Sequence, residues 1–317
     1  MAERQFKKVA VMGAGAVGSF FGGMLARAGA EVTLIARGAH LEAMQKNGLF
    51  IDSIRFQEYV PVKASGDPAA VRGAELILFC VKSLDTDSAA RSIAPHVSPI
   101  AIVLTLQNGV DNAEKINKAT GLVALPTVVY AAAALAGPGR MKHAGRGDLV
   151  IGNSPTEPAA SIAAAFERAG VPCRLSDNIQ GELWQKLVLN CASNAVTALT
   201  RAGYALAVRN PYTRQIMIQA VEETVNVATA AGVRMPVSTK QLTKQLLELF
   251  ESYGAEAVSS TAQDLARGRK TEIDALNGYV ARRGAELGVP APVNQTLHAL
   301  VKLVEDTFDR AASSTAQ

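Results

Sequence analysis

A glycine-rich loop near the start of the chain constrains the fold more than any other feature of the sequence. The loop follows the apolar run 9–12 and reads Gly13-Ala14-Gly15-Ala16-Val17-Gly18. A strand, glycines at this spacing and a following helical pattern together form the dinucleotide-binding fingerprint. Gly13 permits a tight turn, Gly15 lets the backbone approach a pyrophosphate, and Gly18 lets the helix pack closely on the strand. N–H groups at the start of the helix would hold the anion. The alternative is a glycine turn without a ligand.

The first part of the chain alternates short β-branched runs with helical patterns, from residue 7 to about residue 137. Strands are predicted at 8–12, 31–36, 75–81 and 100–106, and helices at 17–28, 39–46, 84–94 and 111–118. Two short alternating runs between 49 and 63 indicate a hairpin or an edge strand. Strands that alternate with helices of this length indicate a parallel sheet with helices on its faces. This part is therefore predicted to be a Rossmann-type, doubly wound α/β domain.

The second part is predicted to be all-helical. Strand-like pieces at 140–143 and 148–151 and a helix that opens at 155–158 and ends near 169 complete the first domain. Beyond 178 the apolar residues recur at helical spacing with almost no strand signal. The predicted helices are 179–200, 209–231, 238–252, 254–267, 272–287 and 293–311. We therefore expect a dinucleotide-binding domain at 1–177 and a helical domain carrying substrate and catalytic residues at 178–317.

Composition excludes several classes of protein. About half of the 317 residues are apolar (49%) and 19% are charged, which excludes a disordered polymer. The 32 basic and 28 acidic residues leave a net charge of +4 without long runs of one sign, and only 5% of residues are aromatic. Nucleic-acid binders carry a concentrated basic patch, so no nucleic-acid partner is expected. Three cysteines without CxxC spacing and four scattered histidines predict no metal site.

The N-terminus has some features of an export signal. Two lysines precede an uncharged run from 9 to 26, but glycines at 13, 15, 18, 22 and 23 interrupt it, and the next segment has the pattern of a strand. The other uncharged run, 122–139, contains Pro126 and Pro138 and is too short to span a bilayer securely. We therefore expect a cytoplasmic protein with no membrane partner.

Polar residues follow three further predicted strands. Ligands of open α/β sheets bind outside the carboxyl ends of the strands, which makes these residues candidates for cofactor binding. Arg37 follows the second strand, where an acidic residue would hold the ribose of NAD. An arginine there suits a 2′-phosphate and favours NADP. Lys82 and Asn108 follow the next two strands. An ordinary solvated arginine and ordinary turn residues remain the alternatives.

The predicted helix 179–200 carries an unusual polar stripe. Lys186, Asn190 and Asn194 are spaced four residues apart and share one side of the helix. No charged residue occurs from 187 to 200, which is unusual for a solvated face. Half-buried amides need hydrogen-bond partners, which a polar small molecule could supply. The alternative is a packed helix whose amides bond to neighbouring helices.

A second polar cluster contains Ser260 and Glu272. Thr271 and Asp274 have the spacing of a capping box, which predicts that Glu272 lies in the first turn of a helix, where the positive end favours an ionised carboxylate. Compensation of the helix dipole alone would also explain Glu272.

These motifs resemble the ketopantoate reductases. The resemblance runs in order through GAGAVG at 13–18, VKS at 81–83, LQNG at 106–109, PGRMKHAGRGDLVIG at 138–152, KLVLNCASN at 186–194 and SSTAQDLARGRKTEID at 259–274. It covers nearly the whole chain, and the later motifs are more specific than the glycine loop. The resemblance implies that the protein reduces 2-dehydropantoate to pantoate with NADPH, on the route to pantothenate.

The resemblance also implies roles for the polar residues of the second part. Lys186 is similar to the family's catalytic lysine, which would give a proton to the reduced keto oxygen. Asn190 and Asn194 are similar to its substrate-binding asparagines, and Ser260 to the serine that binds the substrate carboxylate. Glu272 resembles the acid that contacts the substrate and orders the site.

In the first part, the resemblance implies cofactor binding by the glycine loop, Arg37 and Lys82. Asn108 resembles the asparagine close to both the nicotinamide and the substrate. Asp85 departs from the family, because some members have a glutamine there near the adenosine end. Two alternatives stay open: a reductase of another 2-oxo acid, and a non-catalytic protein that senses NADP. Apolar helices in the second part are compatible with a homodimer, and the sequence does not decide the oligomeric state.

Overall fold

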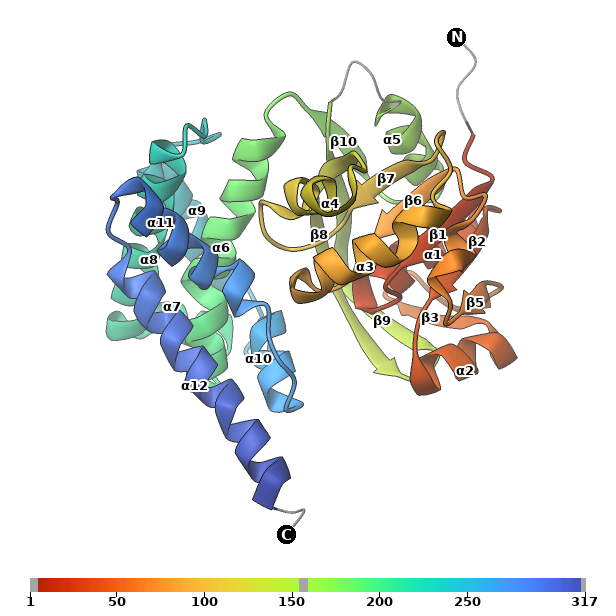
Figure 1. Ribbon diagram of the computed structural model, residues 1–317. Coiled ribbons are helices and arrows are strands. Elements are labelled where there is room, and N and C mark those ends of the chain that lie inside the picture. The colour runs from red at the N-terminus through yellow and green to blue at the C-terminus, as the bar shows by residue number, and fades with distance from the viewer. Residues whose placement is uncertain (1–4, 154–158, 315–317) are drawn as a thin grey trace. The chain divides into compact units, whose positions relative to one another are not determined.

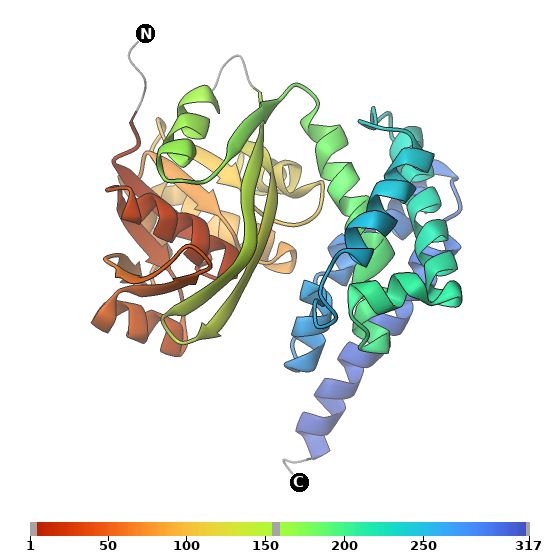
Figure 2. The ribbon, with the colours of Figure 1, turned by 180° about the vertical axis from the view of Figure 1, so that it is seen from behind.

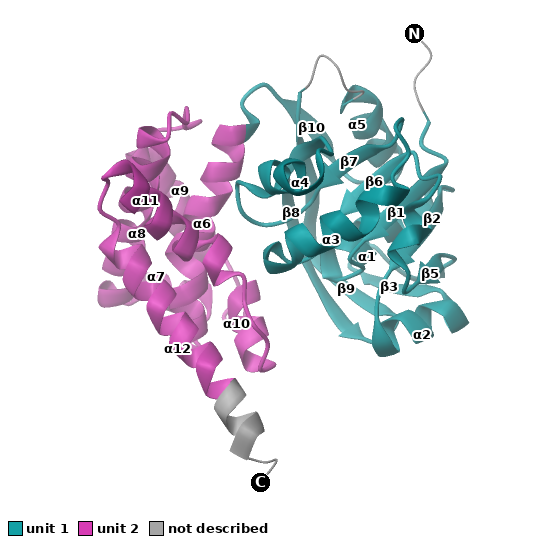
Figure 3. Ribbon diagram, viewed as in Figure 1, with its two compact units in different colours: residues 1–179 teal, residues 180–317 magenta. Residues whose placement is uncertain are grey.

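The computed structural model describes residues 5–153 and 159–314, and these divide into two compact units, 1–179 and 180–317 (Figures 1 and 3). The expected fold class is confirmed, with a parallel-dominated sheet and helices in the first unit and helices alone among the described residues of the second.

The first unit is built on a ten-stranded sheet in the described residues, in the order β4-β3-β9-β8-β7-β6-β1-β2-β5, with β10 paired to β9. The strands are β1 (Lys8–Met12), β2 (Glu31–Ile35), β3 (Leu49–Ser53), β4 (Phe56–Val60), β5 (Lys63–Ser65), β6 (Leu76–Phe79), β7 (Ile102–Thr105), β8 (Ala124–Gly137), β9 (Arg140–Gly152) and β10 (Cys173–Ser176). The run from β8 to β5 is parallel, whereas the β3–β4 and β8–β9 pairs are antiparallel. The predicted hairpin at 49–63 is therefore confirmed as β3 and β4.

Helices cover both faces of this sheet. They are α1 (Ala16–Arg27), α2 (Gly38–Asn47), α3 (Thr86–Ile93), α4 (Asn112–Thr120) and α5 (Ala159–Arg168), with short 3₁₀ turns at Pro68–Val71, Ser83–Asp85 and Ala94–His96. Alternate residues of β1 face opposite layers: 9 and 11 pack with α1 and α5, and 10 and 12 with α3 and α4. Figure 1 shows α3 and α4 in front of the sheet, and Figure 2 shows α1 on the other side. Because both faces are covered there, the central strands β1, β6 and β7 are buried along nearly their whole length rather than alternately.

Three features of the first unit differ from the expectation. Most of the uncharged run 122–139 forms the long strand β8, and the two pieces at 140–143 and 148–151 belong to one strand, β9 (Figure 2). Strand β10 was not predicted. The predicted start of the helix at 155–158 lies outside the described residues, and α5 runs from Ala159.

The second unit packs around α6 (Ile179–Thr200), in which every residue from Cys191 to Ala198 is buried. The other helices are α7 (Tyr204–Arg209), α8 (Pro211–Ala230), α9 (Thr239–Glu251), α10 (Ser260–Ala266), α11 (Asn277–Leu287) and α12 (Pro292–Ser314), with a 3₁₀ turn, η4, at Ile273–Ala275. Apolar side chains of α6, α8, α9 and α12 form one core. No described helix is long and apolar enough to cross a membrane.

Two predicted helices of the second unit were too long. The predicted helix 254–267 is reduced to α10, because the carbonyl of Ala257 accepts a hydrogen bond from the N–H of Tyr204 (3.0 Å) instead of joining a helix. The predicted helix 272–287 is interrupted at Leu276, where φ is −108° and ψ −108°, so α11 begins at Asn277. The predicted helix 209–231 corresponds to α8, but its first residue, Arg209, ends α7 instead. Asn210 caps α8, because its side chain accepts hydrogen bonds from the N–H groups of Tyr212 and Thr213.

Candidate active site

The candidate cofactor residues of the first unit lie along one edge of the sheet. Strands β7, β6, β1 and β2 are consecutive neighbours and parallel, so their carboxyl ends point the same way. The glycine loop follows β1, Arg37 follows β2, Lys82 follows β6 and Asn108 follows β7. The fold thus brings together four segments that are spread over about a third of the chain, as expected for a ligand site of an open α/β sheet.

The glycines of the loop are required by close approaches of the backbone. Gly13 has φ +97°, and a Cβ there would lie 2.8 Å from the backbone nitrogen of Val81. A Cβ on Gly18 would lie 2.3 Å from the carbonyl oxygen of Gly13. Gly15 differs, because a Cβ there would meet no atom within 4 Å and the residue is exposed. Packing within the chain therefore explains Gly13 and Gly18, but not Gly15.

The start of α1 has the features of an anion site. The N-cap residue is Gly15, which has no side chain to cap the helix, and the first turn contains no acidic residue. Backbone N–H groups in the first turn of a helix lack intrahelical partners and carry the positive end of the dipole. Together with the open space at Gly15, this arrangement fits the pyrophosphate of a dinucleotide.

Hydrogen bonds join the loops that carry Lys82 and Asn108. The hydroxyl of Ser83 donates to the carbonyl oxygen of Asn108 (2.8 Å), and the side-chain amide of Gln107 donates to the carbonyl oxygen of Val81 (3.0 Å). Both Lys82 and Asn108 are half-buried. The two loops therefore form one rigid surface next to the glycine loop, which Gly13 contacts through Val81. Asp85 is exposed at the N-cap of α3 and makes no capping hydrogen bond.

Arg37 lies exposed at the N-cap position of α2, and its side chain makes no capping hydrogen bond. One turn along α2, His40 belongs to a chain of hydrogen bonds that sequence reasoning missed. The N–H of Gly139 donates to Nδ1 of His40 (2.9 Å), so Nε2 carries the proton and faces the hydroxyl of Ser19 (3.3 Å). That hydroxyl donates to the carbonyl oxygen of Ala14 in the glycine loop (3.1 Å). Burial lowers the pKa of His40. This favours the neutral ring, whose Nδ1 can accept the hydrogen bond from Gly139.

The polar stripe of the second unit lies on one continuous helix, α6. Lys186 and Asn190 are half-buried, and Asn194 is 4% exposed. The hydroxyl of Ser193 donates to the carbonyl oxygen of Leu189 (2.8 Å), and the buried hydroxyl of Thr197 lies 3.0 Å from the carbonyl oxygen of Ser193. The lack of charge from 187 to 200 follows from the burial of this half of the helix. Packing thus accounts for Ser193 and Thr197. Lys186 and Asn190 precede the fully buried run 191–198 and are only half-buried.

The segment that contains Ser260 is joined to α6. Ser259 caps α10, accepting a hydrogen bond from the N–H of Ala262 (3.1 Å). Its hydroxyl donates to the carbonyl oxygen of Asn194 (3.2 Å) and accepts from the hydroxyl of Thr197 (2.8 Å). Ser260, the first residue of α10, is exposed. The hydrogen bonds of Thr197 and Ser259 therefore hold the segment with Ser260 next to Asn194, the buried end of the polar stripe. The sequence could have indicated a helix cap at Ser259, because serine is a common N-cap residue. It could not indicate that Ser259 bonds to Asn194 and Thr197 of α6.

The predicted capping box at Thr271 is wrong. The hydroxyl of Thr271 does accept from the N–H of Ile273 (3.2 Å), but only the 3₁₀ turn η4 follows, and Glu272 occupies its N-cap position. The carboxylate of Asp274 bonds to His298 and Lys302 of α12 instead of reaching back to the N-cap backbone. Glu272 is half-buried. A three-residue turn has little dipole, so compensation of a helix dipole does not explain Glu272.

The fold defines the class of protein: a Rossmann-type α/β unit with a glycine loop, followed by a helical unit. Two family models match the chain, "Ketopantoate reductase PanE/ApbA" over residues 9–156 and "Ketopantoate reductase PanE/ApbA C terminal" over residues 178–305. The chain belongs to the ketopantoate reductase family, a family of oxidoreductases, which confirms the resemblance seen in the motifs.

Individual relatives agree with this assignment. The 2-dehydropantoate 2-reductase of Pyrococcus horikoshii is 35% identical over 301 residues, 94% of this chain and 97% of that protein. The 2-dehydropantoate 2-reductase of Halobacterium salinarum is 35% identical over 307 residues, 94% of this chain and 99% of that protein.

Solved structures show the same fold. A PanE/ApbA family ketopantoate reductase from Ralstonia eutropha JMP134 is 49% identical, with a TM-score of 0.89 over 95% of this chain and 99% of that one. A D-mandelate dehydrogenase, solved with NADH and anilino(oxo)acetate, is 25% identical, with a TM-score of 0.88 over the same shares of the two chains. Relatives that are named as reductases and dehydrogenases argue against a non-catalytic protein.

Proposed function

We propose that this protein is an NADPH-dependent 2-dehydropantoate 2-reductase, which forms pantoate for pantothenate synthesis. The observation that carries the proposal is the row of Lys186, Asn190 and Asn194 on α6, whose Asn194 end is bonded through Ser259 to the segment that carries Ser260. The relatives at 35% identity are 2-dehydropantoate 2-reductases. We assign cofactor binding to a domain at 1–177 and the substrate and catalytic groups to one at 178–317, with the cytoplasm as its location and no nucleic-acid partner.

The cofactor residues are assigned from the first unit. The pyrophosphate is held by backbone N–H groups of the glycine loop, residues 13–18, with Lys82 nearby as a cation. Arg37 supports NADPH over NADH, because it stands exposed where an acidic residue would bind the ribose of NAD. Asn108 donates a side-chain hydrogen bond at the nicotinamide end and to the substrate. When bound, the cofactor supplies the hydride.

The chain's own residues manage charge and orientation. Ser260 binds the carboxylate of the oxo acid, and Asn190 and Asn194 hold its polar groups. Negative charge develops on the keto oxygen as the hydride arrives, and the ammonium of Lys186 stabilises that charge and then gives up a proton to form the hydroxyl. Glu272 holds the substrate and the lysine in their reactive orientation.

The test is a spectrophotometric assay of NADPH oxidation over a panel of 2-oxo acids. Rapid turnover with 2-dehydropantoate and a KM for NADPH far below that for NADH supports the proposal. The second candidate, reduction of another 2-oxo acid, is favoured by the structural similarity to a D-mandelate dehydrogenase solved with NADH and an oxoacetate. Turnover confined to another 2-oxo acid would support that candidate instead, and equal use of NADH would contradict the proposed preference for NADPH.

A further inference from the structure

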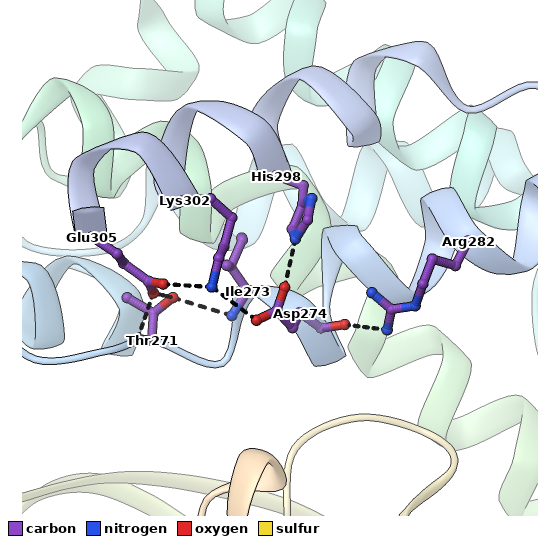
Figure 4. Close-up of polar contacts among 7 residues, drawn as sticks. All are labelled: Thr271, Ile273, Asp274, Arg282, His298, Lys302 and Glu305. Carbon is purple, nitrogen blue, oxygen red and sulfur yellow. Dashed lines mark hydrogen bonds and ion pairs between the residues drawn. The ribbon is translucent and has the colours of Figure 1, made fainter.

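One face of α12 carries three polar side chains that all reach the segment around Glu272. His298, Lys302 and Glu305 are four and three residues apart, which places them on the same side of the helix. Figure 4 shows them pointing at Thr271, which precedes Glu272, and at Asp274, which lies within η4 two residues after it. We name this set of five side chains the α12 clamp.

On the N-terminal side of Glu272, the clamp holds Thr271. The carboxylate of Glu305 accepts two hydrogen bonds at Oε1, from the N–H of Thr271 (2.7 Å) and from its hydroxyl (2.6 Å). Both residues are buried, with Glu305 3% and Thr271 1% exposed. The backbone position directly before Glu272 is therefore fixed by a buried charge.

On the C-terminal side, the clamp holds Asp274. Its carboxylate bonds to Nε2 of His298 (2.6 Å) and to Nζ of Lys302 (3.1 Å), and Lys302 also reaches Glu305 (2.9 Å). The guanidinium of Arg282 donates to the carbonyl oxygen of Asp274 (2.8 Å). Burial raises the pKa of Asp274, but the hydrogen bonds from His298 and Lys302 lower it by more, so the carboxyl stays ionised well below neutral pH.

A need for stability alone does not explain this arrangement. Burying an ion pair costs desolvation energy, and apolar residues of similar volume often stabilise a fold as well or better. Glu272, meanwhile, is followed by only one 3₁₀ turn, so its backbone lacks the repeated hydrogen bonds of an α-helix. Side-chain bonds from Glu305 on one flank, and from His298 and Lys302 on the other, add to the few local hydrogen bonds of this turn.

We propose that the α12 clamp is a positioning device for Glu272, and that Glu305 and Thr271 are positioning residues of the reaction. The inference rests on the proposed role of Glu272 toward substrate and Lys186. Displacement of a catalytic group by about 1 Å can lower a rate by about a hundredfold, so loosening the clamp should act on turnover.

The experiment compares Thr271→Val with Thr271→Ser in the full-length protein. Valine keeps the shape but loses the hydroxyl that donates to Glu305 and accepts from Ile273, whereas serine keeps both bonds. Lys302→Met adds a second site. It leaves the buried carboxylate of Glu305 without this cation, so a lower melting temperature is expected and is recorded beside the kinetics. Glu272→Gln serves as the reference for loss of the acid itself.

Glu223→Gln is the matched control. The carboxylate of Glu223 also binds α12, accepting from the N–H groups of Val293 and Asn294 (2.9 Å each) at the start of the helix, one turn before His298. Its loss should lower the melting temperature without moving Glu272. For each variant, kcat and the KM for the oxo acid are measured with 2-dehydropantoate as substrate, together with the Kd for NADPH and the melting temperature.

We expect Thr271→Val and Lys302→Met to lower kcat/KM by about tenfold or more, with an unchanged Kd for NADPH, and Thr271→Ser to restore most of it. If both variants have the same kinetics as Glu223→Gln, the proposal is overturned. The α12 clamp would then only stabilise the fold. If Glu272→Gln itself has wild-type kinetics, the proposed function of Glu272 is wrong and the inference fails with it.

Discussion

The candidate sites of the two units are made from different parts of the chain. In the first unit the site is largely backbone: a glycine loop, the first N–H groups of α1 and the ends of neighbouring parallel strands. In the second unit it consists of side chains on helices, joined by hydrogen bonds between residues as far apart as Asn194 and Ser259. The comparison teaches that a backbone site depends on local geometry, whereas a side-chain site depends on how distant helices are held together.

The largest effect is expected from Lys186→Ala, which removes a side chain from the side-chain site. As the proposed general acid, Lys186 should contribute about 10²–10⁴ in kcat. The Kd for NADPH should stay close to the wild-type value, because the proposed cofactor residues belong to the first unit. Steady-state kinetics and a binding titration measure the two quantities.

The control for Lys186 is Lys240→Ala, an exposed lysine of α9. It should leave both values unchanged. Near-normal turnover of the Lys186 variant would remove this residue from the mechanism. The polar stripe of α6 would then be explained by helix packing alone.

Arg37→Asp tests the side chain that we propose selects NADPH over NADH. The rest of the candidate cofactor site is formed largely by the backbone. A hydrogen bond to a charged group contributes about 1.5–3 kcal/mol, so KM for NADPH should rise by about tenfold or more. KM for NADH should fall or stay constant, since an acid suits the ribose hydroxyls. An unchanged ratio of the two KM values would show that Arg37 is an ordinary surface arginine.

Gly15→Ala tests whether the backbone of the loop meets a ligand. A Cβ at Gly15 meets no protein atom within 4 Å, so folding should be unaffected. If a pyrophosphate approaches this position, the Kd for NADPH should rise by roughly tenfold, which corresponds to about 1.4 kcal/mol. Isothermal titration calorimetry and thermal unfolding give the two values.

Two further glycine variants serve as comparisons for Gly15→Ala. Gly254→Ala is the matched control, because it also has open space around the new Cβ, and it should change neither quantity. Gly18→Ala should lower the melting temperature, since its Cβ would lie 2.3 Å from the carbonyl oxygen of Gly13. Wild-type binding by Gly15→Ala would argue against a ligand at the loop.

The smallest effect concerns His40, a side chain that supports the backbone site. Burial lowers the pKa of His40 below its ordinary value of about 6.5. As the pH falls through about 6.5, the unfolded chain gains a proton that the folded His40 resists, so the free energy of unfolding decreases.

His40→Asn should remove this part of the pH dependence, as measured by melting temperature between about pH 8 and about pH 5. The control is His96→Asn, a histidine of the same unit that lies outside the chain of hydrogen bonds to Ala14. Parallel pH curves for wild type and His40→Asn would mean that the ring does not have to stay neutral.

The sequence by itself determined most of the first unit. Short apolar runs, a glycine loop and helical patterns are local signals, and β1, β2, β6, β7, α1 and α3 lie within a few residues of their predicted places. It did not reveal that 124–137 is one long strand. Alanines dominate residues 131–134, which have low β propensity, and the strand exists because β9 pairs with it along nearly its whole length.

Only the tertiary structure decided how the polar residues of the second unit are arranged. Spacing on one helix is local, so Lys186, Asn190 and Asn194 could be grouped from the sequence. The contacts of Thr197 with Ser259, of Glu305 with Thr271 and of His298 with Asp274 each join residues 24 to 62 positions apart. A carboxylate or hydroxyl bonds to whichever partner the packed core leaves within reach, and the sequence alone does not state which partner that is. Asp274 has the spacing of a capping residue, yet its charge is satisfied by a helix that begins 18 residues later.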